Sequence, residues 1–195
     1  MKIIHAAVMA NAALALAACL PVTTKTPVGT TVGLAADPAL IGSWKGQSPD
    51  AKQKQDGFFH FMLAKDGSLT VAMVFAAGTS DDGWSVFNAR TATLGKNRYL
   101  NAAMTFDKDE PVKGALKGVT FPVLYVVKGK TLTLYLIDED KAKAAITAGK
   151  IQGTIEPGTS GDVTITATAP DLDAFMAKPE AKEMFKLLIV LKKVD

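Results

Sequence analysis

Side chains that could carry out catalysis are few in this chain of 195 residues. His60 is the one histidine beyond the first 18 residues, which excludes a zinc site built from several histidines. No Gly-x-Ser-x-Gly elbow and no Gly-x4-Gly-Lys-Ser/Thr phosphate loop is present. The run Asp107-Lys108-Asp109-Glu110 lacks the glycine and the distal glutamate of a calcium loop, so we interpret it as a solvated acidic turn. We therefore expect no enzyme, cofactor or metal, although a Ser-His-carboxylate arrangement assembled from distant strands stays open.

Cys19 is the residue whose surroundings predict a chemical modification. Lys2 and an Ala- and Leu-rich run over residues 3–18 precede it, and this run is too short and too weakly apolar for a permanent membrane span. Because Cys19 is the single cysteine, it has no disulfide partner within the chain, and a free thiol is a liability in an oxidising compartment. An incidental thiol after an ordinary signal peptide, or a buried helix of a cytosolic protein, would explain less. We interpret residues 1–18 as a secretion signal.

The four residues Leu16-Ala17-Ala18-Cys19 resemble the bacterial lipobox, in which a branched apolar residue and two small residues precede a lipidated cysteine. This resemblance implies that Cys19 becomes the N-terminus and carries two or three acyl chains, which hold a protein stably on a membrane. Leu20 replaces the Asp that is associated with retention in the inner membrane, and this resembles the outer-membrane class. The expected location is therefore the cell envelope, at the outer membrane facing the periplasm.

Composition predicts one folded domain behind this anchor. Hydrophobic residues make up 48% of the chain and charged residues 21%, which allows an ordinary buried core. The formal charge of +3 comes from interleaved basic and acidic residues, so we expect no nucleic-acid partner. Residues 20–37 are rich in Thr, Pro and Gly, and we expect residues 19–37 to form a flexible tether. The domain is then expected to span residues 38–195.

Short β-favouring runs separated by turn signals fill this domain. Tight turns at residues 66–67, 95–97, 128–130 and 158–161 predict antiparallel hairpins. Sequential hairpins give a mainly β, up-and-down meander of about 8–10 strands, which removes its exposed edges by closing into a barrel. Pairing of the last run with the first would close it. The expected strands cover residues 40–46, 57–64, 69–76, 84–92, 98–105, 122–128, 131–137, 151–155, 162–167 and 187–194.

Two helical segments interrupt the late part of the meander. Asp138 or Asp140 can cap a helix that runs to about Ala148 and ends at Gly149. A second segment over residues 170–185 has Leu172, Phe175 and Met176 on one face, and Pro179 divides it. We expect this apolar face to cover one end of the barrel.

The start of the predicted domain resembles that of lipocalins. Lipocalins open with a Gly-x-Trp motif whose tryptophan plugs the barrel floor, and Gly42-Ser43-Trp44 matches it. The resemblance implies a lipocalin-like barrel over about residues 38–195 and a basic residue packed over the tryptophan, which would be Lys192 or Lys193 here. The other usual lipocalin motifs are absent, so the resemblance concerns architecture.

Candidate ligand contacts are strand residues that alternation could point into a barrel cavity. The aromatic residues among them could equally form a packed core, and a mid-strand arginine is more commonly solvated than buried beside an anionic ligand or a carboxylate. His60 is more simply interpreted as a structural residue than as a ligand contact. The candidates are Phe59, Phe61, Trp84, Arg90, Tyr99, Tyr125 and Tyr135.

Two functions stay open at this point. The first is an envelope-anchored lipoprotein that carries or senses a small apolar or amphipathic ligand, which requires a hollow barrel. The second is a structural or interaction lipoprotein, an assembly accessory or inhibitor, which works through protein contacts and predicts a filled barrel with an apolar surface patch. A cavity inside the barrel would favour the first.

Overall fold

The computed structural model describes residues 21–47, 56–75, 83–107, 110–156 and 162–194. Its main element is an antiparallel barrel of eight strands in which each strand pairs with the next along the chain. The last strand pairs with the first through Lys193 and Trp44, which confirms the predicted closure. The barrel strands are β2 (Gly42–Gln47), β3 (Asp56–Leu63), β4 (Leu69–Phe75), β5 (Gly83–Leu94), β6 (Asn97–Asp107), β8 (Phe121–Lys128), β9 (Thr131–Ile137) and β12 (Phe185–Lys193).

The predicted strand boundaries agree closely with the barrel, but two predicted strands lie outside it. β10 (Gly153–Ile155) and β11 (Val163–Ile165) form a separate sheet with β1 (Thr23–Thr24). β1 runs parallel to β11, and β10 runs antiparallel to it. The barrel therefore takes eight of the ten expected strands, and hydrogen bonds to the N-terminal segment hold the other two at its side.

The predicted helices form where their end signals lie. α1 (Glu139–Thr147) begins after Asp138, whose carboxylate accepts a hydrogen bond from the Lys141 N–H. α2 (Ala169–Met176) is followed by the 3-10 helix η3 (Pro179–Met184), so the segment does divide at Pro179. Two further short 3-10 helices, η1 (Pro38–Leu40) and η2 (Gly114–Leu116), and the two-residue strand β7 (Glu110–Pro111) complete the described elements.

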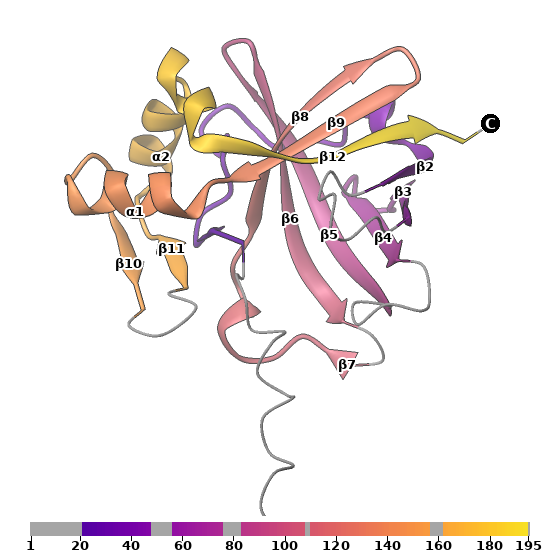
Figure 1. Cartoon of the computed structure of the whole chain (residues 1–195), viewed down its shortest axis with the longest axis horizontal. Helices are drawn as coiled ribbons and strands as arrows, with labels where there is room; N and C mark the ends of the chain where they lie inside the picture. The colour runs from indigo at the N-terminus through magenta and orange to yellow at the C-terminus, as the bar shows by residue number, and fades with distance from the viewer. Residues whose placement is uncertain (1–20, 48–55, 76–82, 108–109, 157–161, 195) are drawn as a thin grey trace, which may run out of the picture.

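α1, α2, β10 and β11 lie together on one side of the barrel, as Figure 1 shows. The apolar side chains of this side layer pack against the outer wall of the barrel and form a second hydrophobic core. Leu172 and Met176 of α2 are fully buried in it, beside Tyr99 of β6. The expectation that this helix covers a barrel end was therefore wrong, because its apolar face packs in the side core with outward-facing residues of β6, β8 and β9.

One end of the barrel is closed by Trp44. This side chain is 0% exposed, and its Nε1–H donates a hydrogen bond of 2.7 Å to the Leu40 carbonyl oxygen. The Lys193 ammonium lies 5.2 Å from the centroid of the Trp44 ring, which identifies Lys193 as the expected basic partner. Gly42 has a φ of +122°, and a Cβ there would lie 3.1 Å from Lys193 Cε. Glycine at this position therefore leaves room for the lysine that covers the tryptophan.

An ionic cluster fastens η1 to the same closed end. The Asp37 carboxylate lies 3.0 Å from the Arg98 guanidinium and accepts a hydrogen bond of 2.7 Å from the Tyr125 hydroxyl. Burial raises the pKa of Tyr125 far above its usual value, and the hydrogen bond to Asp37 raises it further. Tyr125 therefore remains a neutral hydrogen-bond donor throughout the physiological pH range.

Residues 21–37 pack onto the barrel and the side layer, so the prediction of a flexible tether is wrong for this stretch. The Asn101 side chain accepts a hydrogen bond from the Val28 N–H and donates one to the Val28 carbonyl oxygen. The buried Asp173 carboxylate accepts hydrogen bonds from the backbone N–H groups of Gly29 and Thr31 and from the Thr31 hydroxyl. Composition alone predicted a spacer, but Asn101 and Asp173 supply hydrogen-bond partners for backbone groups of this segment. The folded unit therefore includes residues 21–37.

We expect Asp173→Ala to lower the free energy of unfolding by about 2–3 kcal/mol, because two backbone donors lose a charged acceptor. The N-terminal segment should also become sensitive to trypsin at Lys25. Asp171→Ala, which removes an exposed aspartate from the same helix, is the matched control. It should lower the free energy of unfolding by less than Asp173→Ala does. Urea unfolding and limited proteolysis measure both effects, and equal midpoints for the two variants would contradict this role of Asp173.

Candidate functional site

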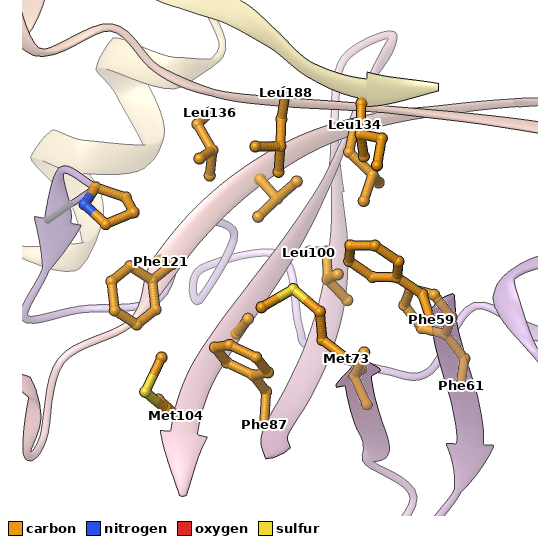
Figure 2. Close-up of a pocket in the computed structure, with 15 residues that line it drawn as sticks. Phe59, Phe61, Met73, Phe87, Leu100, Met104, Phe121, Leu134, Leu136 and Leu188 are labelled. Atoms are coloured by element: carbon orange, nitrogen blue, oxygen red, sulfur yellow. The ribbon is translucent and has the colours of Figure 1, made fainter. Parts of the chain in front are cut away.

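The barrel encloses an apolar cavity of about 340 Å³. Residues of seven strands point into it, and Figure 2 shows these side chains around a common space. Alternate residues do so on most of these strands, as expected where side chains alternate between the two faces of a sheet, whereas β12 contributes the consecutive Leu188 and Ile189 at a register shift. Pro21, from the N-terminal segment, joins them. The full lining comprises Pro21, Phe59, Phe61, Val71, Met73, Phe87, Leu100, Ala102, Met104, Phe121, Val123, Leu134, Leu136, Leu188 and Ile189.

The cavity opens at the end opposite Trp44. Along β4, Leu69 and Val71 are buried and Met73 is half-buried. The same gradient runs along β9, where Leu134 is buried and Leu136 is half-buried. Exposure therefore rises towards the ends of the strands that lie far from the tryptophan. We call this end the mouth, and it is bordered by the half-buried Pro21, Met73, Phe87, Met104, Leu136 and Leu188.

No side chain in the cavity lining carries an oxygen or nitrogen atom. The backbone N–H and C=O groups of the barrel strands are engaged in the ladders between neighbouring strands. Inside the cavity a polar group of a ligand would lose its water without gaining a side-chain partner, which costs several kcal/mol. The cavity therefore suits a hydrocarbon chain, and any polar group on such a ligand has to lie at the mouth or outside.

The mouth is built from side chains that can adjust to a ligand. Met73 and Met104 contribute flexible thioethers, which fit irregular apolar surfaces. Phe87 and Phe121 meet edge to face, with ring centroids 6.3 Å apart. A volume near 340 Å³ lies at the lower end of the range for small-molecule sites, which is about 300–1,000 Å³. This size favours a single slim chain over a bulky ligand.

Two of the seven candidate residues line the cavity, namely Phe59 and Phe61. Three others lie against the side layer or on the outer wall. Tyr99 faces the side layer, where its hydroxyl donates to the Met176 carbonyl oxygen, and Tyr135 packs against the same core. Trp84 is 39% exposed on the outer wall. These three residues therefore do not line the cavity, and Tyr99 and Tyr135 take the packed-core alternative.

The remaining two candidates make polar contacts elsewhere. Tyr125 lies at the closed end with Asp37, outside the cavity lining. Arg90 forms an ion pair at 3.0 Å with Asp66 of the β3–β4 turn, so it takes the solvated position that is more common for a mid-strand arginine. The hydrogen bonds from Ser68 to the Asp66 carboxylate lower the pKa of that group, and Arg90 adds to this effect.

Sequence reasoning missed the residues that form the mouth. The strand register pairs Phe87 with Met104 and places them beside Val71, and Met73 and Phe121 lie on the same inner surface. A signal for Phe87 existed, because the polar Asn88 and Arg90 mark the opposite face of β5 as the outer one. A β-bulge between Val86 and Phe87 shifts the register of β5 against β6, which simple alternation does not predict.

His60 lies on the outer face of β3, between Phe59 and Phe61, and its Nδ1 lies 2.8 Å from the Ser43 hydroxyl. This contact fits the structural role expected for it. Among the residues that the structure describes, no group of three or more His, Cys, Asp or Glu side chains could hold a metal ion. Leu16-Ala17-Ala18-Cys19, the four residues that resemble a lipobox, lie outside the described residues.

Comparison with known proteins returns no match, whether to a family model, to a curated protein or to a solved structure. Within the described ranges, none of the helices combines the length and the apolar character that crossing a membrane requires.

Proposed function

We propose that this protein is a lipoprotein of the bacterial envelope, anchored through Cys19, whose barrel binds one hydrocarbon chain of an amphipathic ligand. The observation that carries the binding proposal is the cavity, because its lining offers carbon and sulfur atoms without polar side-chain groups. A hollow barrel favours ligand carriage over the alternative of an accessory or inhibitor acting through protein contacts. The lipobox supports the anchor.

The expected ligand class follows from the two ends of the site. Trp44 and Lys193 close the far end, so a bound chain enters through the mouth with its apolar end first. Burying a methylene group contributes about 0.8 kcal/mol. Burying roughly ten methylene groups would then contribute about 8 kcal/mol before the cost of association, which makes micromolar about the tightest binding to expect from such a chain. Fatty acids, lysolipids and acyl chains of phospholipids belong to this class.

Neighbouring alanines on β6 provide a matched test of the cavity. Ala102 lines it, whereas the next residue, Ala103, pairs with Asn88 on the outer face. We expect Ala102→Phe to weaken binding of the fluorescent probe N-phenyl-1-naphthylamine about tenfold, because the added ring occupies the cavity. Ala103→Phe should bind as the original chain does.

The probe titrations use the protein from residue 20 onward, so that no detergent competes for the cavity, and a fatty acid should displace the probe. Thermal unfolding of both variants shows whether each is folded. Equal affinity of the two folded variants for the probe would contradict the proposal that the cavity binds a hydrocarbon chain.

A further inference from the structure

The proposed anchor lies next to the mouth of the cavity. Pro21 lines the cavity, and Leu20 alone separates it from Cys19. Successive Cα atoms are 3.8 Å apart, so the Cα atom of Cys19 lies within about 8 Å of the Cα atom of Pro21. The acyl chains on Cys19 therefore start beside the opening through which a ligand would pass.

The chain after Pro21 offers no slack that could lift the barrel away from the membrane. Val22 and Thr24 are buried, and Thr24 exchanges two backbone hydrogen bonds with Thr120. Asn101 and Asp173 hold the following residues in place. A spacer of eighteen free residues would let the barrel turn in any direction, whereas a spacer of one residue fixes which end lies near the lipid.

The outer wall at the mouth carries an exposed apolar patch. Val74 and Trp84 are direct cross-strand partners at the mouth ends of β4 and β5, and Phe106 lies near the mouth end of β6. Their exposed fractions are 39%, 39% and 42%. Tryptophan is enriched at the interface between lipid and water, because its ring is apolar and its N–H is polar. We call Val74, Trp84 and Phe106 the mouth patch.

We propose that the mouth of the barrel faces the bilayer, with the mouth patch in the headgroup layer, and that the ligand is an acyl chain of a membrane lipid that enters directly from the bilayer. This inference rests on the proposed function, because it requires both the anchor on Cys19 and a cavity that takes a hydrocarbon chain. Exchange through a mouth that touches lipid spares the chain the passage through water, which for ten methylene groups would cost about 8 kcal/mol. A lipid surface is thus the partner of the mouth patch.

Two exposed apolar residues at opposite ends of the barrel give a matched pair for the test. Val74 lies at the mouth, and Met62, which is 49% exposed, lies at the closed end of neighbouring β3. The full chain is produced in a bacterial host as Val74→Cys and as Met62→Cys. Because lipidation consumes the Cys19 thiol, each variant carries one thiol, which is labelled with the environment-sensitive dye NBD. The labelled proteins are then reconstituted on vesicles of phosphatidylethanolamine and phosphatidylglycerol.

The proposal predicts that both proteins float with the vesicles. The emission of NBD at residue 74 should shift to shorter wavelengths, and brominated acyl chains should quench it. NBD at residue 62 should keep the emission maximum that it has in water. Native Trp84 provides an independent measurement. Brominated lipid should quench the tryptophan fluorescence of the original chain. It should not quench that of Trp84→Phe, whose remaining tryptophan is the buried Trp44.

Each other outcome overturns the inference. If the proteins float but residue 74 stays in water, or residue 62 enters the lipid, the orientation is wrong while the anchor stands. If the proteins do not float, the anchor fails and the orientation fails with it. A spectral shift at residue 74 that rises with protein concentration in the absence of vesicles would assign the mouth patch to a second copy of this chain or to another protein surface.

Discussion

Replacing Trp44 with Ala is expected to lower the free energy of unfolding by about 3–5 kcal/mol, the usual range for removing a fully buried aromatic side chain. Trp44 is 0% exposed and closes the barrel between Leu40 and Lys193. Its loss leaves an empty volume at the closed end and removes the ring beneath the Lys193 ammonium. Urea unfolding followed by far-ultraviolet circular dichroism measures the difference without relying on tryptophan fluorescence.

Trp84→Ala is the matched control for this prediction, because it makes the same substitution on the outer wall. Trp84 is 39% exposed and belongs to neither of the two hydrophobic cores of the described residues, so we expect the free energy of unfolding to fall by no more than about 1 kcal/mol. If the two substitutions lower the free energy of unfolding by the same amount, Trp44 does not close the end of the barrel as the structure indicates.

Replacing Cys19 with Ala is expected to abolish fatty-acid labelling of the protein. In the proposed lipoprotein, the cysteine thiol is the attachment point, and each further acyl chain strengthens membrane binding by about 0.8 kcal/mol per buried methylene group. The variant should also keep its first 18 residues, because the peptidase that cuts before a lipidated cysteine no longer acts. Metabolic labelling with palmitate and mass analysis of the intact protein measure both effects.

Leu20→Ala is the control, since it changes the neighbouring residue and leaves Leu16-Ala17-Ala18-Cys19 intact. It should be labelled and processed as the original chain is. Continued labelling of Cys19→Ala would refute the assignment of the anchor, and with it the argument that the mouth faces a membrane.

Local patterns predicted most of the barrel, because its strands pair with their neighbours along the chain. Alternating apolar residues and tight turns such as Asp66-Gly67 fix both the strand and its partner. The closing contact was also predictable, since the Gly-x-Trp start required a basic partner near the C-terminus and Lys193 fills this place. The side layer was not predictable in this way. β11 pairs with Thr23 and Thr24, more than 130 residues away, and no local signal specifies such a partner.

The N-terminal segment shows how composition can mislead. Thr, Pro and Gly are typical of flexible spacers, but the same residues are well suited to a bent, ordered chain when polar partners are supplied. Gly29 has a φ of +88°, and a Cβ there would lie 2.1 Å from the Ala92 Cβ, so this glycine is needed for close packing. The partners that hold the segment, Asn101 and Asp173, lie far along the sequence.

Two of the seven candidate site residues line the cavity, and what separates them from most of the others is the lack of a polar side-chain atom. Phe59 and Phe61 were found because they alternate with His60 on a strand and have no polar group. Tyr99, Tyr125 and Arg90 lie elsewhere because each polar group has its partner outside the cavity lining, as with the Tyr99 hydroxyl and the Met176 carbonyl oxygen. In a cavity of this kind, the absence of polar side-chain atoms identifies the lining better than aromatic character does.

Calorimetric titration of a long-chain fatty acid into the protein from residue 20 onward tests the binding of a hydrocarbon chain most directly. We expect one ligand per barrel, with a negative heat-capacity change that reflects burial of apolar surface, and with binding weakened by Ala102→Phe. A folded protein that takes up no fatty acid would contradict the proposal that the barrel carries an acyl chain.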